Sequence, residues 1–232
     1  MVMMYRTYFT FYDEDPGIGH RIEWFISYFK YASLYNRLLN ETYHFPTPDL
    51  LNFDFCNVGY FEKRGIPPIK FYNKGKSWKI FVIYNGDVFE NLSEHERVRF
   101  IWEVVHYNMQ LACIDANNIE LLNASDYAYS KGIELDFRTD YIYLTQEAIL
   151  FGKNITIFIH MKFKESDLIA TLEIYKKGVL IYDTEIARSY VGLDIFRDMI
   201  QSITVDSKQR IIVKMRGSKT MKFEVSDKIV LN

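Results

Sequence analysis

The feature that most constrains the fold of this chain is a change of hydrophobic period near residue 140. In the helical region just before it, residues 93–131, apolar residues recur at three- and four-residue steps, as they do on one face of a helix. After it, they alternate or run in short segments separated by turn residues, as in strands. The change predicts an α+β fold with an antiparallel sheet, interrupted by one short helix over residues 190–201. The expected strands cover residues 155–163, 169–175, 179–187, 202–207, 210–217, 221–226 and 228–232.

The clearest local signal lies at the start of the helical region. Ser93 and Glu96 form an S-x-x-E capping box, in which each side chain bonds to the backbone N–H of the other residue. This pair predicts a helix that begins after Ser93 and runs to about residue 115. One side of this helix is expected to carry Ile101, Val104, Val105, Asn108, Leu111 and Ala112.

A second helix is predicted over residues 119–131. Gly132 follows it and is expected to serve as the left-handed residue that commonly ends a helix. Only Asn117 and Asn118 separate the two predicted helices, and so short a connection favours an antiparallel pair.

The first ninety residues are rich in aromatic side chains. They predict a strand at 4–12, a helix at 20–39 and a hairpin that turns at 73–76. A change of composition then divides the chain into an N-terminal α+β part, 1–92, and a part with the helix pair and sheet, 93–232. No flexible linker marks this boundary, so the two parts are expected to pack together and can form one continuous domain.

Composition places the chain among globular proteins that stay where they are made. Its 232 residues carry a net charge of −2, which gives no overall attraction to nucleic acid or to anionic membranes. The N-terminus lacks the features of a signal peptide, and no apolar stretch is long enough for a membrane span. Cys56 and Cys113 lie far apart and predict buried, reduced thiols. We therefore expect a cytoplasmic protein that binds neither nucleic acid nor membrane and has no cofactor.

Charge is unevenly distributed along the sequence. Residues 93–151 contain 4 Lys and Arg against 10 Asp and Glu, whereas residues 152–232 contain 14 against 10. The helical middle is therefore acidic, and the predicted sheet is basic. An acidic surface favours a basic partner, because complementary charge steers the encounter.

Two alternatives to simple protein binding remain open. Glu103 and His106 form an E-x-x-H on the first helix of the pair, and with His95 they would suit a metal-dependent hydrolase. A solvated helix face also explains them, and His160, inside an apolar strand, is expected to be structural. The other alternative is a nucleic-acid-binding module that uses the basic residues of the sheet. These are Lys208, Arg210, Lys214, Arg216, Lys219 and Lys222.

Three motifs in residues 95–232 resemble those of a known family. They are the N-x-E-L-L helix with its YAY-x-KG end at 118–132, the TLE-x-x-K-x-G hairpin at 171–178, and a helix with Gly192, Phe196 and Met199. In these motifs the chain is similar to immunity proteins of bacterial polymorphic toxin systems.

The resemblance implies a protein without catalytic activity that binds the C-terminal domain of one cognate toxin and blocks its active site. A nuclease that acts in the cytoplasm would be such a basic partner. The acidic middle and its aromatic residues are then the first place to look for the interface. The predicted partner-binding residues are Glu96, Glu103, Glu120, Asp126, Tyr127, Glu134 and Asp136.

Overall fold

The computed structural model divides the chain into two compact units, Met1–Thr139 and Asp140–Asn232. It describes residues 6–12, 21–45, 48–64, 71–164, 167–190, 200–216 and 219–231. The division therefore lies after the helix pair and not near residue 92. The pair belongs to the first unit because its buried side completes the core above the first sheet. The α+β class is as predicted.

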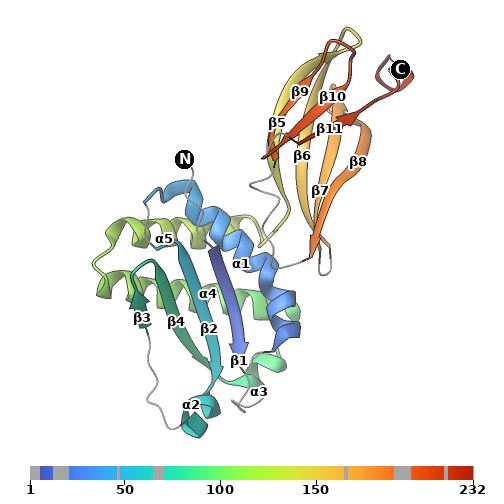
Figure 1. The fold of residues 1–232 in the computed structure, drawn as a ribbon. Coiled ribbons are helices and arrows are strands. Elements are labelled where there is room, and N and C mark those ends of the chain that lie inside the picture. Colours follow the sequence, from blue (N-terminus) through green and yellow to red (C-terminus); the bar gives the residue numbers. More distant parts are fainter. Residues whose placement is uncertain are drawn as a thin grey trace. The chain divides into compact units, whose positions relative to one another are not determined.

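The first unit is built on a four-stranded mixed sheet with the order β1-β2-β4-β3 (Figure 1). β1 pairs with β2, and β2 with β4, in parallel, whereas β3 runs antiparallel to β4. The predicted hairpin at 73–76 is confirmed, and its Gly75 has a φ of +60°, a conformation that glycine adopts without strain. The strands are β1 (Arg6–Tyr12), β2 (Leu50–Asn57), β3 (Phe71–Lys74) and β4 (Ser77–Tyr84).

Three long helices share one aromatic core with this sheet. Phe11 and Phe55 stack with ring centroids 4.6 Å apart. Tyr35, fully buried in α1, meets Phe53 of β2 and Trp102 of α4 edge to face. The aromatic composition of the first ninety residues thus serves the interior, where large rings contribute most to burial. The helices are α1 (Ile22–Thr42), α2 (Val58–Arg64), α3 (Gly86–Glu90), α4 (Glu94–Asp115) and α5 (Ile119–Glu134).

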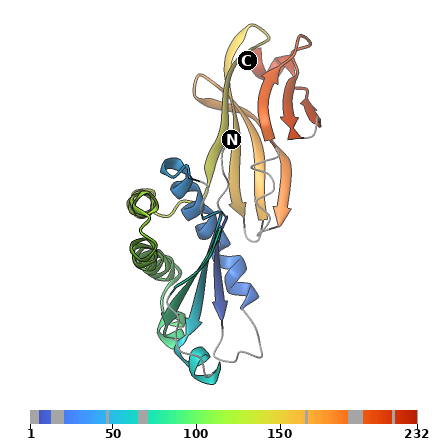
Figure 2. The ribbon, with the colours of Figure 1, turned by 60° about the vertical axis from the view of Figure 1, so that its left-hand side comes forward.

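The capping box and the antiparallel helix pair are both confirmed. Ser93 accepts from the N–H of Glu96, and the Glu96 carboxylate accepts from the N–H of Ser93. α4 and α5 lie side by side and are seen nearly end-on in Figure 2.

Gly132 was wrongly predicted to end the second helix. α5 continues to Glu134, and the left-handed residues that follow are Asp136 and Phe137, with φ of 49° and 54°. Gly132 is instead buried inside α5 because the Trp102 indole occupies the space where a Cβ would stand.

The second unit contains two antiparallel sheets, with the orders β5-β6-β7-β8 and β11-β10-β9. Both contribute to one aliphatic core, for example Ile157 and Leu172 from the first sheet and Ile211 and Val213 from the second. The antiparallel prediction is therefore correct, but the strands separate into two layers. They are β5 (Tyr141–Leu150), β6 (Lys153–Lys164), β7 (Asp167–Lys176), β8 (Val179–Tyr190), β9 (Ile200–Val205), β10 (Ile211–Met215) and β11 (Thr220–Phe223).

Two details of this unit differ from the sequence prediction, and a third falls mostly on residues outside those that the structure describes. β5 was not predicted as a strand. The end of the chain, predicted as a strand over 228–232, forms the helix α7 (Asp227–Leu231), whose Val230 is fully buried in the core. Of the helix expected at 190–201, Tyr190 belongs to β8 and the last two residues to β9, while 191–199 lie outside the described residues.

Candidate functional site

The seven predicted partner-binding residues lie on or just after α4 and α5, but they do not share one face. The acids Glu96, Glu103, Glu120, Asp126, Glu134 and Asp136 are all exposed, and Tyr127 is half-buried. Exposure leaves them available for charge pairing with a partner. Their positions around the helices separate them into distinct groups.

The first group lies on the outward side of α4. Glu96 and Glu103 are seven residues apart and therefore lie on the same side of the helix. Glu96 also belongs to the cap, where its hydrogen bonds with the Ser93 side chain and backbone lower its pKa. Glu103 pairs with Arg99 one turn earlier at 3.0 Å, with both side chains exposed.

Apolar side chains extend this side of α4 toward its C-terminus. Tyr107 is 60% exposed, Leu111 38% and Ile114 65%. Their spacing of four and then three residues continues the line from Glu103. Of the residues expected along one side of α4, Ile101, Val105 and Ala112 are buried, whereas Leu111 is exposed. We call the set Glu96, Glu103, Tyr107, Leu111 and Ile114 the α4 outer face.

The second group follows the flank of α5 that approaches α1. Glu120, Tyr127 and Glu134 repeat every seven residues and so share one side of the helix. The Tyr127 hydroxyl donates to Glu41 of α1 at 2.5 Å, and this hydrogen bond raises its pKa. Glu134 pairs with Lys131 at 2.6 Å. These contacts hold two of the three predicted residues in place within the chain.

Asp126 lies between the helices, where it faces α4. Gln110 donates to its Oδ1 at 3.2 Å, and His106 Nε2 is 3.6 Å from the same oxygen. Asp136 lies beyond the end of α5 in the left-handed turn. Sequence reasoning therefore placed the acids correctly on the surface of the pair but could not divide them among its sides.

His106 is held by α5 on three sides. Its Nδ1 is 3.3 Å from the Oγ of Ser125, its ring stacks on Tyr129 with centroids 4.2 Å apart, and Asp126 lies at its Nε2. Ser125 is fully buried and also hydrogen-bonds the Tyr35 hydroxyl at 2.9 Å. Burial lowers the pKa of His106, against a smaller opposing effect of Asp126. A serine without exposed surface cannot meet a substrate, so the contact serves helix packing.

The residues of the predicted hydrolase site have separate surroundings. Glu103 pairs with Arg99, His106 turns toward α5, and the His95 ring contacts Phe137. Throughout the described residues, no group of three or more His, Cys, Asp or Glu side chains is arranged to hold a metal ion. Both cysteines are buried free thiols, as predicted, and burial raises the pKa of Cys113 to about 12.

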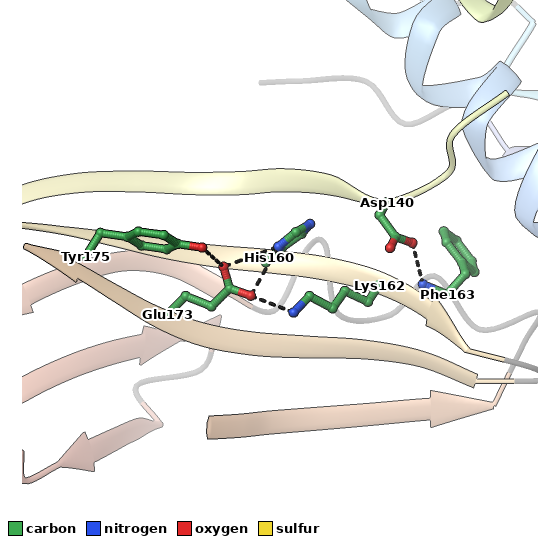
Figure 3. Close-up of polar contacts among 6 residues, drawn as sticks. All are labelled: Asp140, His160, Lys162, Phe163, Glu173 and Tyr175. Carbon is green, nitrogen blue, oxygen red and sulfur yellow. Dashed lines mark hydrogen bonds and ion pairs between the residues drawn. The ribbon is translucent and has the colours of Figure 1, made fainter. Parts of the chain in front are cut away.

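A polar cluster that the sequence reading did not single out lies on the sheet of the second unit (Figure 3). Glu173 of β7 is 5% exposed, yet it lies on the face away from the aliphatic core. Lys162 Nζ donates to its Oε1 at 2.6 Å, and the Tyr175 hydroxyl donates to Oε2 at 3.2 Å. His160 Nδ1 lies 3.2 Å and 3.3 Å from the two oxygens.

These contacts keep Glu173 ionised. Burial alone would raise the pKa of Glu173, but the hydrogen bond and charge of Lys162, together with His160, hold that pKa below its usual value. An ionised carboxylate only accepts, so Nδ1 of His160 carries the proton in this contact. The cluster thus links β6 to β7 through a charged centre. His160, expected to be structural, has Glu173 as the partner of its Nδ1. Charged residues at alternate positions of two neighbouring apolar strands were the available signal.

The basic residues of the second alternative are split by the β10–β11 hairpin. Arg210 forms a two-pronged pair with Asp206 at 2.9 Å and 2.7 Å, which neutralises it. Lys214 and Lys222 are exposed on adjacent strands, on the side away from the buried Val213. Lys208, Arg216 and Lys219 are also exposed, in the segments that connect β9, β10 and β11. Surface lysines and arginines alone are a weak electrostatic footprint for nucleic acid.

Comparison with protein-family models, with curated proteins and with solved structures gives no match for this chain. The elements and their division make it an α+β protein of two units. Among the described residues, no helix is long and apolar enough to cross a membrane.

Proposed function

We propose that this chain is an immunity protein, which binds the C-terminal domain of a cognate bacterial toxin and blocks the toxin's active site. The observation that carries the proposal is the set of exposed acids on α4 and α5. The motifs that resemble immunity proteins, in residues 118–132 and 171–178, form a packed helix and a hairpin. They support a fold in common with that family, whereas recognition of one particular toxin would depend on surface residues.

Recognition in this proposal proceeds through charge and burial. The acids steer a basic toxin domain, such as a nuclease, toward the helix pair and raise the association rate. Apolar and aromatic side chains then lose contact with water and slow dissociation. The encounter takes place in the cytoplasm, where the toxin would act, and needs no cofactor.

The proposal is tested by the gene immediately upstream and its product. A toxin gene is expected there, and co-expression of this chain should restore growth to cells that produce that toxin's C-terminal domain. The purified proteins should form a one-to-one complex by calorimetry, with affinity that falls as salt rises. A toxin domain that kills equally well in the presence of the folded chain would refute the proposal.

A further inference from the structure

We infer that the α4 outer face is the docking surface, and that it inserts into an apolar groove of the toxin domain that carries Lys and Arg at one end. The inference rests on the proposed function and adds the contact site and the chemistry of its partner. Exposed apolar side chains are aligned on one helix, a pattern that folding alone does not require.

The fold of α4 is satisfied without these side chains. Its opposite side supplies the core, where Ile101, Val105 and Met109 are fully buried. Tyr107, Leu111 and Ile114 lie on the solvent side of the same helix, two turns of surface that contribute little to stability. Single exposed apolar residues are common on proteins, but three at positions i, i+4 and i+7 are the pattern with which helices enter grooves.

The helix that presents them is rigid. It spans 22 residues, carries a complete capping box and is fixed to α5 by the hydrogen bond from Trp102 Nε1 to the Tyr129 carbonyl at 3.1 Å. A partner that binds the outer face therefore meets a preformed surface and loses little free energy to ordering it.

Charge gives the docking a direction. Glu96 and Glu103 occupy the N-terminal half of the outer face, and the apolar residues occupy the C-terminal half. The Glu103–Arg99 pair is exposed and worth little, so Glu103 can exchange Arg99 for a cation of the partner. The complementary surface has basic residues at one end of an apolar groove. Tyr107, next to the acids, is the aromatic anchor between the two halves.

The test compares the α4 outer face with one exposed apolar residue on another helix. The variant Tyr107→Ala/Ile114→Gln removes the anchors, while Ile22→Gln, at a residue 58% exposed on α1, is the matched control. Binding to the upstream toxin domain is measured by calorimetry, with the fold checked by circular dichroism. The double variant should lose affinity by on the order of 100-fold, and the control should stay near the wild-type value.

A second variant separates charge from burial. Glu103→Lys should slow association by roughly 10-fold at low salt and alter dissociation much less, because it removes steering. Glu147→Lys, at an exposed position of β5 in the second unit and outside the acidic surface of the helix pair, is its control and should leave the association rate close to wild type.

Each result decides between distinct conclusions. If the wild-type chain protects cells and the folded Tyr107→Ala/Ile114→Gln variant binds equally well, the outer face is not the interface, although the immunity function stands. If the wild-type chain neither binds nor protects, both the function and the inference fall. If light scattering finds a dimer that this double variant abolishes, the occupant is a second copy, and docking of a toxin there is overturned.

Discussion

The Trp102 indole of α4 lies directly against Gly132 of α5 and donates from Nε1 to the Tyr129 carbonyl. The indole occupies the space where a Cβ of residue 132 would stand. The contact is possible only because residue 132 has no Cβ, so the separation of α4 and α5 at this point depends on residue 132 being glycine. Trp102 itself is fully buried and also meets Tyr35 of α1.

Replacing Gly132 with Ala should therefore destabilise the first unit. An alanine gains about 1 kcal/mol of helix propensity over glycine, but its Cβ would overlap the indole, and such overpacking costs about 1–3 kcal/mol or more. Urea unfolding followed by tryptophan fluorescence should show the net loss. Ser130→Ala, at an exposed position of the same helix, is the control and should be neutral or slightly stabilising. Stability gained by Gly132→Ala would contradict the described contact.

His106 should make stability depend on pH in the mildly acidic range. Burial lowers its pKa in the folded state from the usual 6.5, so the unfolded chain binds a proton first as pH falls. The contribution of His106 to the free energy of unfolding is therefore fully present above pH 6.5. It is lost as pH falls from 6.5 through the lower native pKa. His106→Asn should remove this decline. Unfolding free energies measured on both sides of 6.5 for the two proteins provide the test, and parallel curves would show that His106 does not cause it.

Glu173→Gln should weaken the sheet of the second unit. The substitution keeps the shape but removes the charge that Lys162 and His160 face, at a cost of about 2 kcal/mol. The native pKa of Glu173 lies below its usual 4.5, so its contribution is present above 4.5 and lost as pH falls through the native pKa. Hydrogen exchange in β6 and β7 should accelerate in the variant at neutral pH.

A neighbouring carboxylate provides the control for that experiment. Glu147 is exposed and accepts one hydrogen bond, from Thr156 at 3.1 Å. Glu147→Gln should leave exchange in β6 and β7 almost unchanged. Equal effects of the two substitutions would mean that the buried contacts of Glu173 stabilise β6 and β7 no more than the exposed hydrogen bond of Glu147 does.

Reversing the charges of Glu103 and Glu120 together should weaken toxin binding and make the residual association less favoured by low salt. Because the two acids lie on different sides of the helix pair, the single reversals should be unequal, with Glu103→Lys responsible for most of the loss. Association rates at two salt concentrations measure this. Unchanged affinity in the folded double variant would move the interface to the first ninety residues.

Local patterns predicted the fold well where a few neighbouring residues determine it. The capping box at Ser93, the turn at Gly75 and the antiparallel strands of the second unit depend on side chains close in sequence. The parallel pairing of β1 with β2 was not predicted, because it joins residues more than forty positions apart, such as Phe9 and Phe53. No local period distinguishes that pairing from an antiparallel one.

The site was harder to predict for the same reason. Exposure of Glu103 follows from its position on an amphipathic helix, but exposure of Leu111 depends on where α5 and the sheet pack against α4. Gly132 was misread because a glycine near a helix end usually supplies a turn, whereas here a ring from another helix selects it. Glu173 was missed because its partners His160 and Lys162 lie on a different strand.

The three tryptophans of the chain, Trp24, Trp78 and Trp102, all belong to the first unit. Two of them are buried, and Trp24 packs against the same aromatic core. Tryptophan fluorescence is therefore a probe of the first unit alone. Unfolding of the second unit is followed by its tyrosine fluorescence and by circular dichroism of its backbone. Each unit has its own hydrophobic core, so a denaturation curve followed by tryptophan and one followed by circular dichroism need not coincide. Their difference would measure how far the two halves unfold independently, without any label.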